Sequence, residues 1–213
     1  MEVLFEDKNV IFAVKPVGVA SQASSNGNDM IKLLSEHTKS EVFPVHRLDT
    51  ATGGVMVYAK NKKTAAKLSA AFAENKTIKE YLAVVCGCVP DFGEMTDYLW
   101  HDKLKNKSFS VKTERKGAKK AILSYEKLAD GDGFSFVRVK LETGRTHQIR
   151  AQFATRGFPL CGDGKYGGKS GYPMSLWCYK LTIPYPTDNE TMTFTSLPHA
   201  NVSPWTLFSF ENL

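Results

Sequence analysis

The sequence predicts an α+β protein with a mixed, mainly antiparallel sheet as its core and helices on its flanks. Strand-like segments outnumber amphipathic helical ones, and most neighbouring strands are separated only by short turn-forming stretches. Of the 213 residues, 42% are hydrophobic and 23% are charged, which is typical of a chain that buries a substantial core. We therefore expect one domain spanning residues 1–213.

The first half of the chain predicts a hairpin, a helix, a strand, a second helix and a further strand. Their ranges are 2–15, 28–37, 53–60, 61–76 and 81–89. The hairpin turns at Asp7-Lys8-Asn9, and either Asn28 or Asp29 is placed to cap the first helix. The apolar stripe of the second helix consists of Ala65, Leu68, Ala71 and Phe72.

The second half predicts two strands, at 121–129 and 134–142, that are joined by Asp-Gly-Asp-Gly. In the second of these, apolar residues alternate with Arg138 and Lys140, which indicates one buried face and one solvent-exposed, basic face. A helix of about three turns over 146–157 should end at Gly157. Two more strands, at 176–186 and 191–197, complete the pattern.

The charge is unevenly distributed. The net charge is +6, and residues 103–120 contain eight basic side chains against one acid, Glu114. Such a segment attracts polyanions by releasing their counterions, although a basic run that stands alone is more often a solvated hairpin or loop. No apolar run approaches the length of a membrane helix and no secretory signal is recognisable, so we expect a cytoplasmic protein without membrane association.

The four cysteines show neither a C-x-x-C pair nor zinc-ligand spacing with histidine. Cys86 and Cys88 alternate on a predicted strand and should point to the same face, while Cys161 and Cys178 stand alone. Reduced thiols with a structural role are the expectation for such a set.

Two segments resemble sites of phosphate chemistry but lack residues that such sites require. Residues 163–170, DGKYGGKS, approach the phosphate-binding loop, yet Asp163 occupies the position of its first glycine and no helix can follow. The stretch beginning at Asp49, DTATGG, is weakly similar to phosphatases that form an aspartyl-phosphate. Those enzymes hold magnesium with further carboxylates, and Ala51 stands where one of them is needed.

Three separated stretches together resemble the RluA-type family of pseudouridine synthases. They are H-R-L-D-x-x-T-x-G from His46, KEYLAVVCG with Tyr81, and residues 142–168 with R-T-H-Q-I-R, G-x-P and G-D-x-x-Y-G. The resemblance extends from about Val3 to Leu181 and implies a cofactor-free, metal-free isomerisation of uridine to pseudouridine in ribosomal or transfer RNA. It also implies that the protein binds this RNA. Many relatives carry a small RNA-binding domain ahead of the catalytic part, but the first predicted strand here begins at about residue 3, so we expect no separate N-terminal RNA-binding domain. We expect the protein to be a monomer.

The resemblance assigns Asp49 as the catalytic aspartate, a nucleophile that attacks either the ribose or the uracil ring. It places Arg150 against that carboxylate, which a cation would keep ionised. Tyr81 matches a tyrosine whose ring packs on the target base. Arg47 matches the arginine that fills the gap left when the base is flipped out of its stack.

Four further positions correspond to substrate- or RNA-binding positions. Arg145 is expected to contact phosphate, and His147 lies three residues before Arg150, where it can share its face of the helix. Thr52 belongs to the turn that presents the aspartate, and Leu176 lines the base pocket. A protein that keeps the fold and binds RNA without catalysis is the alternative, against which the presence of Asp49, Tyr81 and Arg150 counts.

The sequence departs from the family pattern in two places. Gly53 stands where the family usually has serine. The family's leucine-histidine-alanine becomes Leu176-Trp177-Cys178. Any contact made by that serine hydroxyl is therefore in doubt here, and Trp177 changes the packing near the pocket.

Overall fold

The computed structural model describes residues 1–188, 190–211 and 213. The chain divides into two compact units, Met1–Lys79 with Trp177–Pro198, and Glu80–Leu176 with His199–Leu213. The prediction of one catalytic domain over 1–213 is not tested by this division and stays a prediction.

The first unit is built on strands whose order is β1 (Glu2–Glu6), β2 (Val10–Lys15), β4 (Gly53–Ala59) and β10 (Leu176–Pro184). The short strand β3 (Phe43–Pro44) pairs with β4, and β11 (Thr191–Thr195) pairs with β10. Most neighbours run antiparallel, while β4 and β10 run parallel through Gly53 and Gly54. The sheet is therefore mixed.

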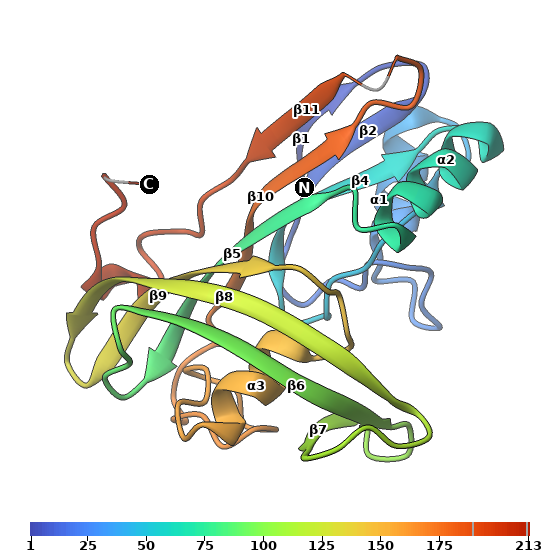
Figure 1. Ribbon diagram of the computed structural model, residues 1–213. Helices are drawn as coiled ribbons and strands as arrows, with labels where there is room; N and C mark the ends of the chain where they lie inside the picture. Colours follow the sequence, from blue (N-terminus) through green and yellow to red (C-terminus); the bar gives the residue numbers. More distant parts are fainter. Residues whose placement is uncertain (189, 212) are drawn as a thin grey trace. The chain divides into compact units, whose positions relative to one another are not determined.

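Two helices accompany these strands, α1 (Met30–Thr38) and α2 (Lys62–Ala73) (Figure 1). Asp29 caps α1 by accepting the backbone N–H of Lys32, and Asn61 caps α2 in the same way. Leu68 of α2 packs with Val55, Val57 and other apolar residues of the strands in one buried cluster. The predicted amphipathic helix is confirmed as α2, and of the two predicted cap residues of the first helix Asp29 is the one used.

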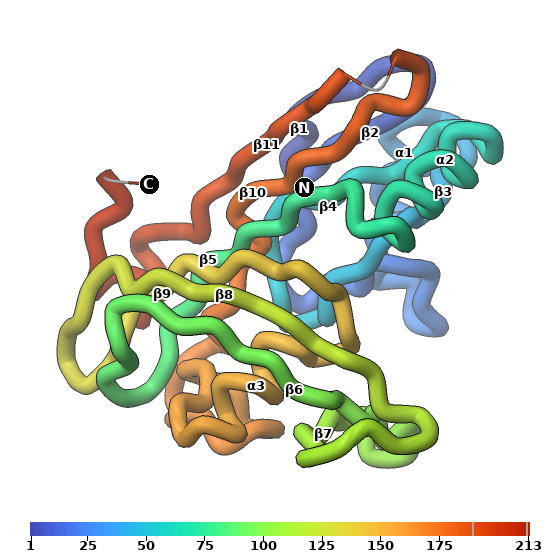
Figure 2. Tube along the Cα trace, in the orientation of Figure 1, coloured from blue at the N-terminus to red at the C-terminus, as the bar shows by residue number. Residues whose placement is uncertain are grey.

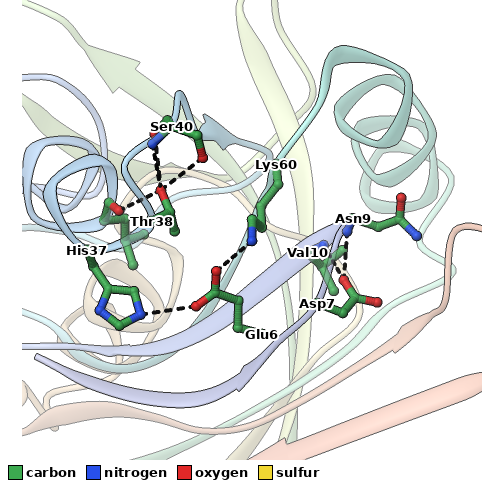
Figure 3. Close-up of polar contacts among 9 residues, drawn as sticks. Glu6, Asp7, Asn9, Val10, His37, Thr38, Ser40 and Lys60 are labelled. Carbon is green, nitrogen blue, oxygen red and sulfur yellow. Dashed lines mark hydrogen bonds and ion pairs between the residues drawn. The ribbon is translucent and has the colours of Figure 1, made fainter.

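The predicted turn between the first two strands is also present (Figure 3). The carboxylate of Asp7 accepts the backbone N–H groups of Asn9 (2.7 Å) and Val10 (2.8 Å), which closes the turn. Next to it, Glu6 forms an ion pair with Lys60, and this hydrogen bond is the largest cause of the lowered pKa of Glu6. The two strands are thus tied to the end of β4.

The second unit contains the strands β5 (Ile78–Cys86), β9 (Phe134–Leu141), β8 (Ala118–Gly131), β6 (Phe92–Asp102) and β7 (Lys107–Val111), in that spatial order. The pairs β8–β9, β6–β8 and β6–β7 are antiparallel. The helix α3 (Gln148–Thr155) packs on this sheet through Ala151 and Phe153, and a 3₁₀ turn covers Trp205–Leu207 (Figures 1 and 2). The α+β prediction is confirmed.

Four local predictions need correction. The helix α3 has eight residues rather than about three turns. It begins only at Gln148, because the left-handed conformation of His147 (φ 55°) prevents an earlier start. Strands β3, β6 and β7 were not predicted. Cys88 lies beyond the end of β5 at Cys86, so the two thiols do not alternate along one strand.

The fourth correction concerns the face of β9 that carries Arg138 and Lys140. Arg138 donates to Glu126 of β8 at 2.6 Å, and Glu80 and Glu94 line the same shallow depression as the two basic residues. The face is therefore mixed in charge rather than basic. The pattern of one strand does not reveal what its neighbours place beside it.

Candidate active site

The loop of residues 46–52 leads into β4, and its backbone is held from several sides. His46 Nε2 accepts the N–H of Val57 (3.1 Å), and the ring stacks on Phe72 with centroids 4.5 Å apart. Burial lowers the pKa of His46 to about 3, with a further contribution from the charge of Lys79, so the ring is neutral and able to accept. His46 therefore anchors the start of the loop.

The middle of the loop is fixed by Ser21. Its hydroxyl donates to the carbonyl of Leu48 (2.6 Å) and accepts the N–H of the same residue (2.9 Å). The carbonyl of Ser21 in turn accepts the hydroxyl of Tyr58 at 3.0 Å. Leu48, the residue before Asp49, is buried and bonded through both backbone groups.

A buried lysine also supports this loop, by hydrogen bonds to backbone carbonyls. Lys15 is 0% exposed, and its ammonium group donates to the carbonyls of Pro16 (2.9 Å), Val19 (2.6 Å) and Thr50 (3.1 Å). Burial lowers the pKa of Lys15 to about 8, and the negative charge of Asp49 acts in the opposite direction. Lys15 thus places a positive charge near Asp49 while it binds the next carbonyl along the loop.

The three predicted residues of this loop differ in exposure. Arg47 is exposed, Asp49 is half-buried and Thr52 is buried. The Asp49 carbonyl accepts the N–H of Thr52 at 2.9 Å, which forms the turn before β4. The hydroxyl of Thr52 has no hydrogen-bond partner among the described residues, an arrangement that costs free energy unless a ligand or water satisfies it.

The two departures from the family pattern meet in the structure. A Cβ atom on Gly53 would lie 2.2 Å from Cζ3 of Trp177, so the indole fills the space that a serine would need. The indole Nε1–H donates to the carbonyl of Ser196 at 2.8 Å. Gly54 adopts φ 118°, and a Cβ there would lie 2.3 Å from the carbonyl oxygen of Cys178, so only glycine fits.

In the second unit, the guanidinium group of Arg150 is held by Asp163. Nε donates to Oδ2 at 2.6 Å and Nη2 donates to Oδ1 at 2.8 Å, a two-point pair in which both side chains are at least nine-tenths buried. A charge pair this deep needs good geometry to offset its desolvation. Asp163 therefore fixes the position of the guanidinium group.

The N-terminal end of α3 is organised by Gln148. Its Oε1 accepts from Thr143 Oγ1 (2.9 Å) and from the N–H of Arg145 (3.0 Å), and its Nε2 donates to the carbonyl of Ile122 (3.0 Å). His147 is buried, and its Nδ1 lies 3.1 Å from the hydroxyl of Tyr166. These contacts orient the turn of helix from which Arg150 projects.

The remaining predicted residues lie in the same unit. Tyr81 lies on β5 and is 7% exposed, and Leu176 is buried where β10 begins. Arg145 is exposed and donates through Nε to the carbonyl of Lys120 at 2.9 Å, which ties it to the basic segment.

The predicted site residues thus form two groups. Arg47, Asp49 and Thr52 lie within one loop of the first unit, whereas Tyr81, Arg145, His147, Arg150 and Leu176 belong to the second. Within each group the structure brings the residues onto neighbouring segments. That the two groups form one site stays a prediction.

Sequence reasoning missed the contributions of Lys15, Gln148 and Tyr166. A lysine that ends an apolar strand before Pro16 offers one signal, because a lysine in a fully buried strand needs a partner. The described residues include no group of three or more His, Cys, Asp or Glu side chains that could hold a metal ion. In that same part of the chain, no helix has the length and apolar character needed to cross a membrane.

Residues 9–155 match the family model described as RNA pseudouridylate synthase. The chain belongs to this family. The matched range contains Asp49, Tyr81 and Arg150, so the family resemblance predicted from the three stretches is confirmed.

Curated relatives of this family are similar over most of the chain. The ribosomal large subunit pseudouridine synthase D of Borreliella burgdorferi is 36% identical over 198 residues, which cover 85% of this chain and 60% of the relative. An uncharacterised RNA pseudouridine synthase of Aquifex aeolicus is 33% identical, covering 91% and 68%. The dual-specificity RNA pseudouridine synthase RluA of Haemophilus influenzae is 31% identical and covers 91% of each chain. The chain thus spans about 60% of the length of the first relative and nearly all of the third.

Solved structures agree on the fold. Human RNA pseudouridylate synthase domain containing 1 aligns with a TM-score of 0.79 at 23% identity, covering 92% of this chain and 83% of that one. Human RNA pseudouridylate synthase domain containing 4 aligns with a TM-score of 0.76, also at 23% identity, covering 93% of this chain and 89% of that one. The mixed sheet with its three helices is therefore the family fold.

Proposed function

We propose that this protein converts specific uridines of ribosomal or transfer RNA to pseudouridine. The observation that carries the proposal is the family match over residues 9–155, a range that includes the aspartate, tyrosine and arginine of the family motifs. Relatives named as ribosomal and transfer RNA pseudouridine synthases give the substrate class. The reaction breaks the bond from ribose C1′ to uracil N1 and forms the bond from C1′ to C5, with loss of the C5 proton and protonation of N1.

In this proposal Asp49 is the nucleophile. Three backbone segments support its loop, through His46, Ser21 and Lys15, so the carboxylate starts from a defined position. A fixed nucleophile reduces the entropy lost on reaching the transition state. The ammonium group of Lys15 also places a positive charge near the Asp49 carboxylate.

Arg150 is proposed to act on the same carboxylate. Asp163 accepts from Nε and Nη2, which fixes the orientation of the guanidinium group. Tyr81 would stack on the uracil ring, whose faces are equally available before and after it rotates. Arg47 is exposed at the start of the loop, as a residue that replaces a flipped base must be.

RNA binding is proposed to involve the basic segment 103–120. It forms the β6–β7 turn, strand β7, the loop before β8 and the first residues of β8, and its lysines 103, 105, 112, 116, 119 and 120 are exposed. A cation–π contact of Arg115 with Trp100, at 5.3 Å, adds an aromatic surface. Because the β9 face is mixed in charge, we assign it no part in binding RNA.

The test compares pseudouridine maps of total RNA from cells with the gene, without it, and with Asp49→Ala. We expect one or more sites to disappear in the deletion strain, to return with the wild-type gene, and to stay absent with Asp49→Ala. Asp188→Ala, which changes an exposed carboxylate elsewhere, should restore the sites and serves as the control. If every site persists without the gene, the protein is not the synthase, and RNA binding without catalysis becomes the function to examine.

We further propose that the protein works as a monomer in the cytoplasm and needs no cofactor. Its mass of 23.7 kDa makes the monomer easy to distinguish by light scattering after gel filtration. Purified protein should modify RNA in a buffer that contains a metal chelator, and a dependence on added metal would contradict this part of the proposal.

A further inference from the structure

The β6–β7 hairpin is bonded to the turn that follows Asp163. Lys165 Nζ donates to the carbonyls of Asn106 (2.9 Å) and Lys105 (3.4 Å), at the tip of the hairpin. In return, Lys107 Nζ donates to the carbonyl of Lys165 at 2.6 Å. Lys107 of the basic segment and Lys165 of the turn are thus both used for backbone contacts, where a purely solvated loop would leave its lysine in water.

The hydroxyl of Tyr166 reinforces this attachment. It accepts the N–H of Ser108 (2.7 Å) and donates to the carbonyl of Ser108 (3.1 Å) on strand β7. A phenol has one proton, so the contact with His147 Nδ1 (3.1 Å) is then donated by the histidine. Tyr166 therefore joins the hairpin to the residue that precedes α3.

The ring of Tyr166 contacts the two cations on either side of this junction. The guanidinium carbon of Arg150 lies 5.0 Å from the ring centroid, and the ammonium nitrogen of Lys107 lies 4.8 Å from it. Arg150 also donates two hydrogen bonds to the carboxylate of Asp163. The guanidinium group is therefore held by both an acid and an aromatic ring, which come from the same short turn.

The close approach within this turn is built into the sequence. A Cβ on Gly168 would lie 2.0 Å from the carbonyl oxygen of Leu160 and 2.7 Å from the backbone N of Asp163. The N–H of Gly168 donates to the Asp163 carbonyl at 2.9 Å, and that of Tyr166 donates to it at 3.0 Å. The turn is thus a compact structure that holds Asp163 and Tyr166 in a fixed relation.

We propose that Tyr166 is a positioning residue that couples the placement of the β6–β7 hairpin to the orientation of Arg150. The proposal rests on the proposed function, in which Arg150 acts on the Asp49 carboxylate and the basic segment binds RNA. A hairpin that is seated on RNA then holds Tyr166 through Ser108 and Lys107, and Tyr166 holds the guanidinium group. Tyr166 itself touches neither substrate nor the reacting atoms.

Tyr166→Phe tests the hydroxyl, because it keeps the ring against Arg150 and removes the bonds to Ser108 and His147. Tyr166→Leu removes the ring as well. Tyr172→Phe, a tyrosine of the same unit, is the matched control. The measurement is the single-turnover rate constant at saturating enzyme, which is insensitive to a fraction of unfolded protein, together with RNA affinity.

For Tyr166→Phe we expect a single-turnover rate constant reduced roughly tenfold with RNA affinity changed less than about twofold. Tyr166→Leu should lose at least another factor of about ten. Hydrogen exchange at the Ser108 amide should be faster in Tyr166→Phe and unchanged in Tyr172→Phe. Adding Lys107→Met should reduce the rate less in Tyr166→Leu than in the wild type, because the shared ring is already gone.

Two results would overturn the coupling. One is a single-turnover rate constant at the wild-type value in both Tyr166 variants. The other is a loss of RNA affinity with no change in the rate of chemistry, which would make Tyr166 a binding residue. Neither touches the proposed function, which fails instead if the wild-type protein forms no pseudouridine or if Asp49→Ala is as active as the wild type.

Discussion

Restoring the family's serine at position 53 should create a collision whose size the structure defines. A Cβ on Gly53 lies 2.2 Å from Cζ3 and 2.6 Å from Cε3 of the Trp177 ring, where ordinary contacts begin near 3.4 Å. The ring is 5% exposed and tethered to Ser196, so it cannot swing into solvent without losing that hydrogen bond. We expect Gly53→Ser to lower the free energy of unfolding by about 3 kcal/mol.

The same geometry predicts that the second family residue relieves the first. Trp177→His alone leaves a cavity and removes the bond to Ser196, which should cost about 3 kcal/mol. In that variant the space beside position 53 is open, so adding Gly53→Ser should cost less than about 1 kcal/mol. The double-mutant cycle should therefore show a favourable coupling of about 2 kcal/mol.

Urea unfolding of the four proteins, followed by circular dichroism, measures the cycle. Gly54→Ala is the control, because its Cβ would meet the backbone carbonyl of Cys178 at 2.3 Å and the residue requires φ 118°. Its cost should be the same with either residue at position 177. If Gly53→Ser costs as much beside histidine as beside tryptophan, to within about 0.5 kcal/mol, the steric account is wrong.

Three further predictions concern the loop and the basic segment. Thr52→Val should raise the free energy of unfolding by about 1 kcal/mol, because it removes a buried hydroxyl that lacks a protein partner; a urea midpoint lower than that of Thr52→Ser would contradict this. Because burial lowers the pKa of His46 to about 3, the unfolded chain takes up a proton below pH 6.5 that the folded protein refuses. Stability should therefore fall from pH 6.5 toward pH 3 with a slope of up to about 1.4 kcal/mol per pH unit, and urea unfolding of His46→Gln should lack this component. Changing exposed Lys112 and Lys116 to glutamate should weaken RNA binding and reduce its salt dependence by roughly 0.7–0.9 per lost phosphate contact, whereas the same change at Lys62 and Lys63 on α2 should leave both unaltered in filter binding.

The elements that the sequence predicted well are those whose burial follows a simple period. The apolar run of β2 and the amphipathic pattern of α2 are of this kind, and their bounds agree to within a few residues. Strand β6 was missed because two of its inward positions are not apolar. Gly93 lies beneath the ring of Tyr125, and Asp97 accepts from Gln152 of α3 and from Arg156, which follows that helix. An alternating pattern is invisible when its inward members depend on partners elsewhere in the chain.

In the candidate site, too, the residues that depend on tertiary contacts were harder to predict than the others. Asp49, Tyr81 and Arg150 were assigned by family resemblance, because no spacing or periodicity distinguishes them from other acids, tyrosines and arginines. The residues that hold them were harder to find, since each acts through a tertiary contact. Lys15 binds a carbonyl 35 positions away in the sequence, and Tyr166 bonds to a strand 58 positions earlier.

The stretch from Asp163 to Ser170 shows how far local similarity can mislead. Its glycines and lysines match much of a phosphate-binding loop, yet each has a different use in the folded chain. Gly168 allows the backbone to approach Leu160, and the lysine at 165 bonds the β6–β7 hairpin. The carboxylate of Asp163, which would repel phosphate, is the group that holds the guanidinium of Arg150. Asp163, which stands where a phosphate-binding loop has glycine, thus excludes an anion and instead fixes a cation. Asp163→Asn should therefore disturb the orientation of Arg150, and reduce the single-turnover rate constant, more than any change to the neighbouring lysines.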